Sequence, residues 1–292
     1  MSDIIFGSGI TIGTGISVTA PPPNIRAIFG YGYSPGPIRH ALTNIVSSTG
    51  VVGNDVTGVG TGRSSLAATG YGGDKAIFGY GTTDGGGGGI TSITNLVSNA
   101  GVVANDTAGV GTARSQLTAA GYGTDKAIFG YGVTFSPTTP RSITNLVSNT
   151  GVVATDTAGV GTARFSLAAA GYGTDKAIFG YGNTISPTIY YSITNLVSNT
   201  GVVANDTTGV GTARNDLAAA GYGTDKAIFG YGYNNTTGNL SLTNLVSNTG
   251  VVATDTTGVG TNRYSLAAAG YGGDKAIFGF GDAGGQSTMA PK

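Results

Sequence analysis

The chain has 292 residues, with 14 basic and 14 acidic side chains and neither cysteine nor tryptophan. Without cysteine it can form no disulfide and no thiolate metal site, and a net charge near zero argues against nucleic acid as a partner. The 54 glycines follow no Gly-X-Y period, which excludes a collagen-like rod. Because Gly, Thr, Val and Tyr are abundant and glutamate is absent, the composition favours strands and turns over helices.

The N-terminal residues match no other part of the chain. The opening MSDIIFGSG has neither a basic nor a sustained apolar stretch, so no secretory signal is visible. No apolar stretch is long enough to cross a bilayer as a helix, and we expect no membrane insertion. Strand-like stretches from Ile4 to Ala20 lead into three prolines, which read as a stiff spacer. We expect residues 1–23 to complete the closure of the repeat array that follows.

The rest of the chain is dominated by one phrase, AIFGYG, which occurs five times and a sixth time as AIFGFG. Its phenylalanines are spaced by 49 to 51 residues, and they are Phe29, Phe78, Phe129, Phe179, Phe229 and Phe278. The segments 143–182 and 193–232 differ at only four of their 40 positions. A fixed period of this size indicates a propeller, a solenoid or an array.

One repeat divides into four short strands separated by turn residues. The predicted strands are Ser166–Gly173, Asp175–Gly182, Ser192–Gly201 and Val202–Gly211. The small residues of the first strand suit the crowded axis of a ring, and the larger Ile and Phe of the second suit the space between neighbouring sheets. We expect the glycine after each Phe to let the chain turn or take a positive φ.

Four strands in about 50 residues is the size of one propeller blade. Six second-strand copies therefore predict an all-β propeller of six four-stranded blades over residues 24–281. Residues 282–292 are expected to form a flexible C-terminal tail.

The repeat resembles two known groups. An arginine, a small apolar strand, a glycine turn and then KAIFGYG give an order similar to the kelch repeat, over Arg26 to Gly281. The sequence departs from kelch in having Gly-Tyr-Gly or Gly-Phe-Gly for the adjacent glycine pair, and in lacking the fourth-strand tryptophan. DKAIFGYG together with TNLVSNTGVV also resembles repeats in structural proteins of tailed bacteriophages, particularly phages of cyanobacteria. That second resemblance implies a place in the virion.

Most charged residues recur in register. The repeated aspartates of the fourth strand are Asp55, Asp106, Asp156, Asp206 and Asp255. Eight residues later in each case stand Arg63, Arg114, Arg164, Arg214 and Arg263. The Asp-Lys pairs begin at Asp74, Asp125, Asp175, Asp225 and Asp274. A catalytic site is a single place that needs several different groups, so we interpret these charges as partners that join blades or fix turns.

Other chemical motifs are weak. The segment GVGTGR at 58–63 lacks the Gly-Lys-Ser/Thr ending of a phosphate loop. Each NDT or TDT turn offers one carboxylate, whereas calcium needs six or more oxygens. His40 has no partner residue at the spacing of metal ligands. We predict no enzyme activity, no cofactor and no metal site.

Sequence differences between the copies concentrate in two places. One is the segment between the second and third strands, and the other is the residue pair after each repeated arginine. Because strands alternate in direction, both should lie on the same face of the disc. The turn between the third and fourth strands, on the opposite face, stays close to Ser-Asn-Thr-Gly. Aromatic and arginine residues are enriched at recognition surfaces. The predicted partner contacts are Tyr33, Arg39, Phe135, Arg141, Phe165, Tyr190, Tyr191, Asn215, Asp216, Tyr233 and Tyr264.

Two functions fit these features. One is a structural adapter of a phage particle, a tail, fibre or capsid-associated propeller that docks on other virion proteins after assembly in the host cytoplasm. The alternative is a lectin-like propeller that binds glycan on the host surface. Identical pockets in every blade would favour a lectin, whereas loops that differ, as here, favour a protein partner in one docking pose.

Overall fold

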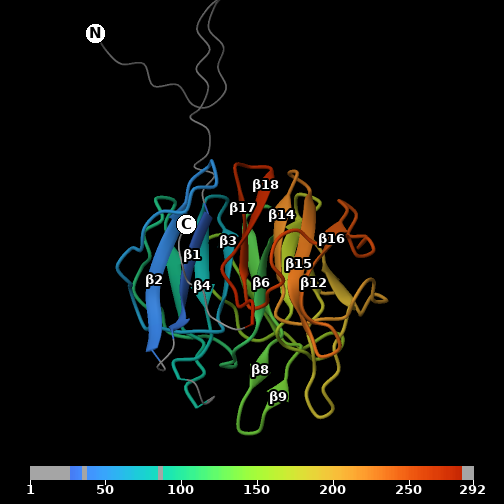
Figure 1. The fold of residues 1–292 in the computed structure, drawn as a ribbon. Helices are drawn as coiled ribbons and strands as arrows, with labels where there is room; N and C mark the ends of the chain where they lie inside the picture. The colour runs from blue at the N-terminus through green and yellow to red at the C-terminus, as the bar shows by residue number, and fades with distance from the viewer. Residues whose placement is uncertain (1–26, 35–37, 85–87, 285–292) are drawn as a thin grey trace, which may run out of the picture.

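The computed structural model describes residues 27–34, 38–84 and 88–284. Within these ranges the protein is all-β without a helix, and its small antiparallel sheets recur with the spacing of the repeat (Figure 1). In chain order the strands are β1 (Ala27–Ser34), β2 (Ile38–Val46), β3 (Ala67–Tyr71), β4 (Lys75–Gly79), β5 (Thr94–Val97), β6 (Thr118–Tyr122), β7 (Lys126–Gly130), β8 (Val133–Thr134), β9 (Thr139–Pro140), β10 (Thr144–Val147), β11 (Ala168–Tyr172), β12 (Lys176–Gly180), β13 (Thr194–Val197), β14 (Ala218–Tyr222), β15 (Lys226–Asn234), β16 (Gly238–Val246), β17 (Ala267–Tyr271) and β18 (Lys275–Gly279).

Each copy of the repeat forms one sheet, numbered here in chain order. Sheet 1 is β1-β2, sheet 2 is β3-β4-β5, sheet 3 is β6-β7-β10, sheet 4 is β11-β12-β13, sheet 5 is β14-β15-β16 and sheet 6 is β17-β18. A separate hairpin, β8-β9, extends from sheet 3 at the end of the molecule away from the β17–β18 turn (Figure 1).

The AIFG strand is the centre of every three-stranded sheet. In sheet 4, β12 pairs antiparallel with β11 through Ala168↔Gly180 and with β13 through Gly180↔Thr194. Ala177, Ile178 and Phe179 are all fully buried, although successive side chains of a strand point to opposite faces. Both faces of β12 are therefore covered, which explains a continuous apolar run in place of alternation.

The fourth predicted strand does not form as a continuous element. In sheet 4 it contacts β13 through only two bridges, Val197↔Val203 and Thr194↔Thr207, whose partners shift by one residue. The Asn195 side chain occupies this irregularity, because its Nδ2 donates to the Ala204 carbonyl at 3.0 Å. The prediction of four-stranded blades is therefore wrong for the described residues. The sheets have two or three strands, with an irregular fourth segment along the outer edge of sheets 1 to 5.

The sheets pack on one another through a repeated aromatic pair. The Tyr181 ring of sheet 4 lies 5.1 Å from the Phe229 ring of sheet 5, between centroids. Equivalent pairs join every consecutive pair of sheets from 1 to 6, at 5.0 to 5.4 Å. Phe280 of sheet 6 lies 5.3 Å from Phe29 of sheet 1.

The glycine after each Phe has a different role from the one predicted. Gly180 has no positive φ; a Cβ there would stand 2.7 Å from Cζ of Phe229, so the absence of a side chain admits the neighbouring ring. The following Tyr181 takes the left-handed conformation, with φ 66°. Close packing between sheets, rather than chain reversal, fixes this glycine.

Two sets of backbone hydrogen bonds link neighbouring sheets at the two ends of their inner strands, which are β3, β6, β11, β14 and β17. At one end the amides of Gly72, Gly123, Gly173 and Gly223 donate to the Asp carbonyl of the next sheet at 2.6 to 2.7 Å. At the other end Gln116, Ser166, Asp216 and Ser265 each donate to the corresponding carbonyl of the preceding sheet at 2.8 to 2.9 Å. Sheets 2 to 6 are therefore fixed at both ends of their inner strands.

The predicted domain limits are only partly covered. Residues 1–23 lie outside the described residues, as do 285–292 of the predicted tail. Asp282, placed in the tail by the sequence, pairs with Tyr264 through two backbone hydrogen bonds of 2.9 and 3.0 Å. The ordered repeat therefore extends past Gly281.

Candidate recognition surface

The repeated arginines and aspartates join neighbouring sheets, as predicted. Arg164 is fully buried, and its guanidinium donates to Tyr181 O, Thr162 O and Asn195 Oδ1 at 2.7 to 3.0 Å. It also lies over the Tyr131 ring of sheet 3, 4.5 Å from the ring centroid. This arrangement satisfies a buried guanidinium with acceptors and an aromatic face.

The aspartate of the fourth segment completes each junction. Asp206 accepts hydrogen bonds from the Thr162 amide and from Asn195 Nδ2, and its Oδ1 lies 3.8 Å from a guanidinium nitrogen of Arg164. Burial raises the pKa of Asp206, but these hydrogen bonds and the arginine charge outweigh it, so the pKa is lower than usual. The folded state therefore favours the ionised form of Asp206.

Burial also perturbs the groups around the arginines. It lowers the pKa of the Arg164 guanidinium and raises the pKa of Tyr131 and Tyr181 to about 12. Arginine stays charged at any pH a protein meets, so these shifts report packing. The whole cluster is part of the framework.

The Asp-Lys pairs lie at the surface. Lys176 Nζ is 2.8 Å from Asp175 Oδ1, and the lysine side chain is 43% exposed. The backbone carbonyl of Asp175 accepts from Gly123 of sheet 3. The side-chain pair is solvated, and the backbone makes the contact between sheets.

Both variable sets lie at the same end of the sheets, as predicted; we call this end the loop face. The pairs Phe165↔Asn183, Asn215↔Tyr233 and Tyr264↔Asp282 each join a residue after a repeated arginine to the segment that follows a second strand. We call the opposite end the turn face. It carries the inner hairpin turns such as Tyr172–Lys176 and the Ser-Asn-Thr-Gly turns such as 198–201.

Tyrosines from three sheets meet on the loop face. The Tyr233 ring lies 6.3 Å from Tyr190 and 5.9 Å from Tyr264, between centroids. Next to them Asn215 is buried, and its Nδ2 donates to Asn183 Oδ1 at 3.0 Å. Six of the predicted contact residues belong to or border this cluster: Tyr33, Tyr190, Asn215, Asp216, Tyr233 and Tyr264.

The other predicted contact residues are spread around the same face. Arg39 lies over the ring of Tyr33, 5.1 Å from its centroid, and Tyr33 is 64% exposed. Arg141 donates from Nε to Thr134 Oγ1 at 3.2 Å, within the β8–β9 region. Three more residues are half-buried, without a ring contact to the tyrosine cluster: Phe135, Phe165 and Tyr191.

Asp216 carries the one raised carboxyl pKa resolved among the described residues. Burial raises it, and a hydrogen bond with Ser166 offsets this in part. Its negative charge in turn raises the pKa of Tyr190 and Tyr264, for which burial is the larger cause. A recessed carboxyl group therefore lies beside the tyrosine cluster.

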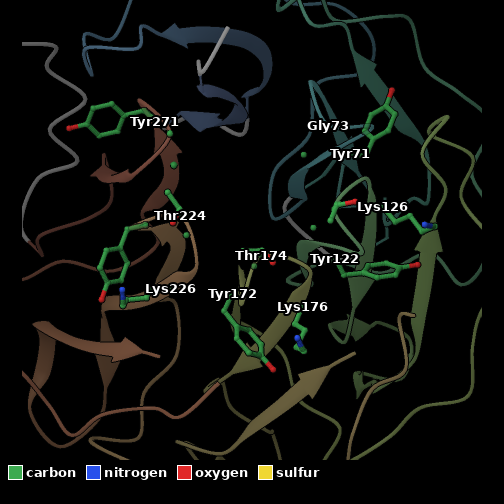
Figure 2. A pocket seen from close by; sticks show the side chains of 18 of the residues that line it. Tyr71, Gly73, Tyr122, Lys126, Tyr172, Thr174, Lys176, Thr224, Lys226 and Tyr271 are labelled. Carbon is green, nitrogen blue, oxygen red and sulfur yellow. The ribbon is translucent and has the colours of Figure 1, made fainter. Parts of the chain in front are cut away.

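Sequence reasoning missed a hollow on the turn face. It has a volume of about 410 Å³ and is lined by equivalent residues of sheets 2 to 6 (Figure 2). Each sheet contributes a glycine, a tyrosine, a lysine and either glycine or threonine. The fivefold Gly-Tyr-Gly-Thr/Gly-Asp-Lys phrase was the available signal. The phrase by itself indicates only turns, because one copy of it makes no concavity.

Within the described part of the chain, no group of three or more His, Asp or Glu side chains is arranged to hold a metal ion. The same residues include no helix with the length and apolarity needed to cross a membrane. No protein-family model matches the chain, and no curated protein shows significant sequence similarity to it.

Proposed function

We propose that the six sheets close into a kelch-like propeller ring. The contact between sheets 6 and 1 supports this, because it repeats the packing of the other junctions. A Cβ at Gly272 of sheet 6 would lie 3.0 Å from Ser48 O of sheet 1, and one at Gly123 of sheet 3 would lie 2.9 Å from Asn199 O of sheet 4. The 5.3 Å contact of Phe280 with Phe29 adds the aromatic pair of the other junctions.

We further propose that the protein is a non-enzymatic structural adapter of a phage particle, docking on another virion protein through the loop face. One observation carries the proposal: the buried arginine junction is nearly the same in successive repeats, while the side chains it holds on the loop face differ. Equivalent positions after the arginine carry Ser64, Ser115, Phe165, Asn215 and Tyr264. A partner in one pose needs such unequal contacts. The virion assignment rests on the resemblance of the repeat phrase to phage structural proteins.

Glycan binding at the host surface is the second candidate. The specific observation in its favour is the Tyr190, Tyr233 and Tyr264 cluster, since aromatic rings offer apolar faces with a polar tip. Against it, the cluster occurs once, whereas the repeat offers five chances to build equal sugar sites.

Co-sedimentation with particles that lack the protein tests the adapter proposal. The loop-face triple variant Tyr190→Ser, Tyr233→Ser, Tyr264→Ser should lose binding, because aromatic anchors often cost about 2 kcal/mol each, or roughly thirtyfold in affinity. The matched control is Thr150→Ala, Thr200→Ala, Thr249→Ala on exposed turns of the opposite face. Melting of both variants is compared with the original protein first. Binding lost in the control but kept in the tyrosine variant would refute docking through the loop face.

A further inference from the structure

We infer that the tyrosine cluster of the loop face binds a basic side chain, arginine in particular, of the docking partner. This rests on the proposed function and adds the chemistry of the contact. The cluster consists of Tyr190, Tyr233 and Tyr264. Asn215 pairs with Tyr233, Asp282 pairs with Tyr264, and the charge of Asp216 acts on Tyr190 and Tyr264. Three features of these residues support a cation as the ligand.

The three neighbouring tyrosine rings are the first feature. The planes of Tyr190 and Tyr233 make an angle of 60°, and those of Tyr233 and Tyr264 an angle of 53°. Rings inclined at these angles do not form a parallel stack, and all three remain half-buried. A ring face attracts a cation through its quadrupole, most strongly where water is partly excluded.

The second feature is an excess of acceptors without a cation. Asn215 is 8% exposed, and its Oδ1 is buried without a hydrogen-bond partner. Asp282 accepts from the Tyr264 hydroxyl at 3.3 Å, and Asp216 is bonded by Ser166. No lysine or arginine in the described chain forms an ion pair with either aspartate. Such a set suits a ligand rich in N–H donors.

The third feature is that this protein already pairs arginine with tyrosine. At five junctions a guanidinium carbon lies 4.3 to 4.7 Å from a tyrosine ring centroid. On the loop face itself Arg39 covers Tyr33 in the same way. A planar guanidinium can stack on a ring while donating in its own plane, which an ammonium cannot do.

Sheet 3 provides an internal control, because it lacks this chemistry. In sheet 3 the position of Asp216 is taken by Gln116 and that of Tyr233 by Val133. The cluster is built from residues of sheets 4 to 6, and only one basic group of a partner would be bound there.

Backbone amide NMR of the full chain, titrated with the methylamide of N-acetyl-arginine, tests the inference. The matched probe is the citrulline analogue, which is planar and uncharged. We expect saturable shifts at the amides of Asp216, Tyr233 and Tyr264 with the arginine probe, and none at Gln116 or Val133. The citrulline probe should bind at least about fivefold more weakly, the ratio that corresponds to one cation–π contact.

Variants separate the two contributions. Asp216→Asn removes the charge and keeps the shape, and should weaken the arginine probe about fivefold, while Gln116→Asn in sheet 3 leaves it unchanged. Equal binding of both probes, or no saturable shift, overturns the inference. Shifts caused by galactose or N-acetylglucosamine instead of arginine would also overturn it, and would assign the cluster to glycan.

The outcome of the arginine titration can be distinguished from the outcome of the particle-binding experiment. If the tyrosine variant loses particle binding but arginine causes no shift, docking through the loop face stands and the basic side chain is wrong. If arginine binds as expected while the tyrosine variant still sediments with particles, the site exists and the docking proposal is wrong.

Discussion

The junctions between sheets and the loop face contain the same residue types, arginine and tyrosine, in different surroundings. At the junctions, Arg164 and Tyr131 are buried, in contact, and repeated in equivalent form around the molecule. On the loop face, Arg141 and Tyr233 are half-buried and have no counterpart of the same type in every repeat. The difference teaches that side-chain type alone does not mark a recognition residue. Repetition and full burial mark the framework, and divergence with partial exposure marks the surface.

Replacing an arginine in each region should give the largest contrast. Arg164→Ala should lower the free energy of unfolding by about 3–5 kcal/mol, because it leaves Asn195 Oδ1 and two backbone carbonyls without their buried donor. Arg141→Ala on the loop face should stay within about 0.5 kcal/mol. Urea unfolding measures both. Equal losses in the two variants would erase the distinction between the regions.

A glycine pair tests how tightly the junctions are packed. Gly180→Ala would place Cβ 2.7 Å from the Phe229 ring, and overpacking of this kind costs about 1–3 kcal/mol. Gly279→Ala is the matched control, because a Cβ there would lie 3.6 Å from Phe29, an ordinary contact distance. Thermal melting should separate the two variants. If both melt alike, the close approach of the neighbouring ring is not what requires glycine.

Acid should weaken the junctions by protonating their aspartates. Hydrogen bonds and the arginine charge hold the pKa of Asp206 low despite burial, so its stabilising effect is present above the unfolded pKa of about 3.9 and is lost as pH falls through the folded value. Asp106, Asp156 and Asp255 shift in the same direction. The free energy of unfolding should therefore fall below about pH 4. Asp206→Asn should reduce this acid dependence.

Asp216 should behave in the opposite way. Burial raises its pKa, so the folded state holds its proton more tightly than the unfolded state, and stability falls as pH rises from the unfolded to the folded pKa. Asp216→Asn should consequently be more stable than the original protein at pH 7, and the gain should vanish in acid. A loss of stability at pH 7 would mean that the carboxylate has a structural partner, like the junction aspartates.

Part of this structure could be predicted from the sequence because the chain repeats. The predicted second strand Asp175–Gly182 contains the observed β12, because a continuous apolar run ending in glycine specifies a strand covered on both faces. The alternation of strand direction also placed both variable sets at one end. The fourth strand was predicted but does not form, because Asn195 bonds the backbone of the neighbouring segment, a side-chain competition that no apolar pattern reveals.

The site was only partly readable for a related reason. Tyr190, Tyr233 and Tyr264 are far apart in the chain, and each belongs to a different sheet, so their contact depends on how the sheets pack. The same holds for the hollow on the turn face, which is lined by five copies of one phrase, one from each of sheets 2 to 6. Sequence comparison among the repeats found the variable positions. That comparison could not predict which of the variable positions contact one another.

Chemical cross-linking of the protein in the assembled particle, followed by mass spectrometry, tests the central claim that the framework presents the loop face to a partner. Since the described loop-face residues include no lysine, photoreactive phenylalanine analogues are placed at Tyr33 and Tyr233, and at Thr150 and Thr200 on the turn face as the matched set. We expect cross-links to the proposed virion partner from Tyr33 and Tyr233 and none from the turn-face positions. Cross-links confined to Thr150 and Thr200 would show that a partner grips the uniform turns instead, and would contradict the account.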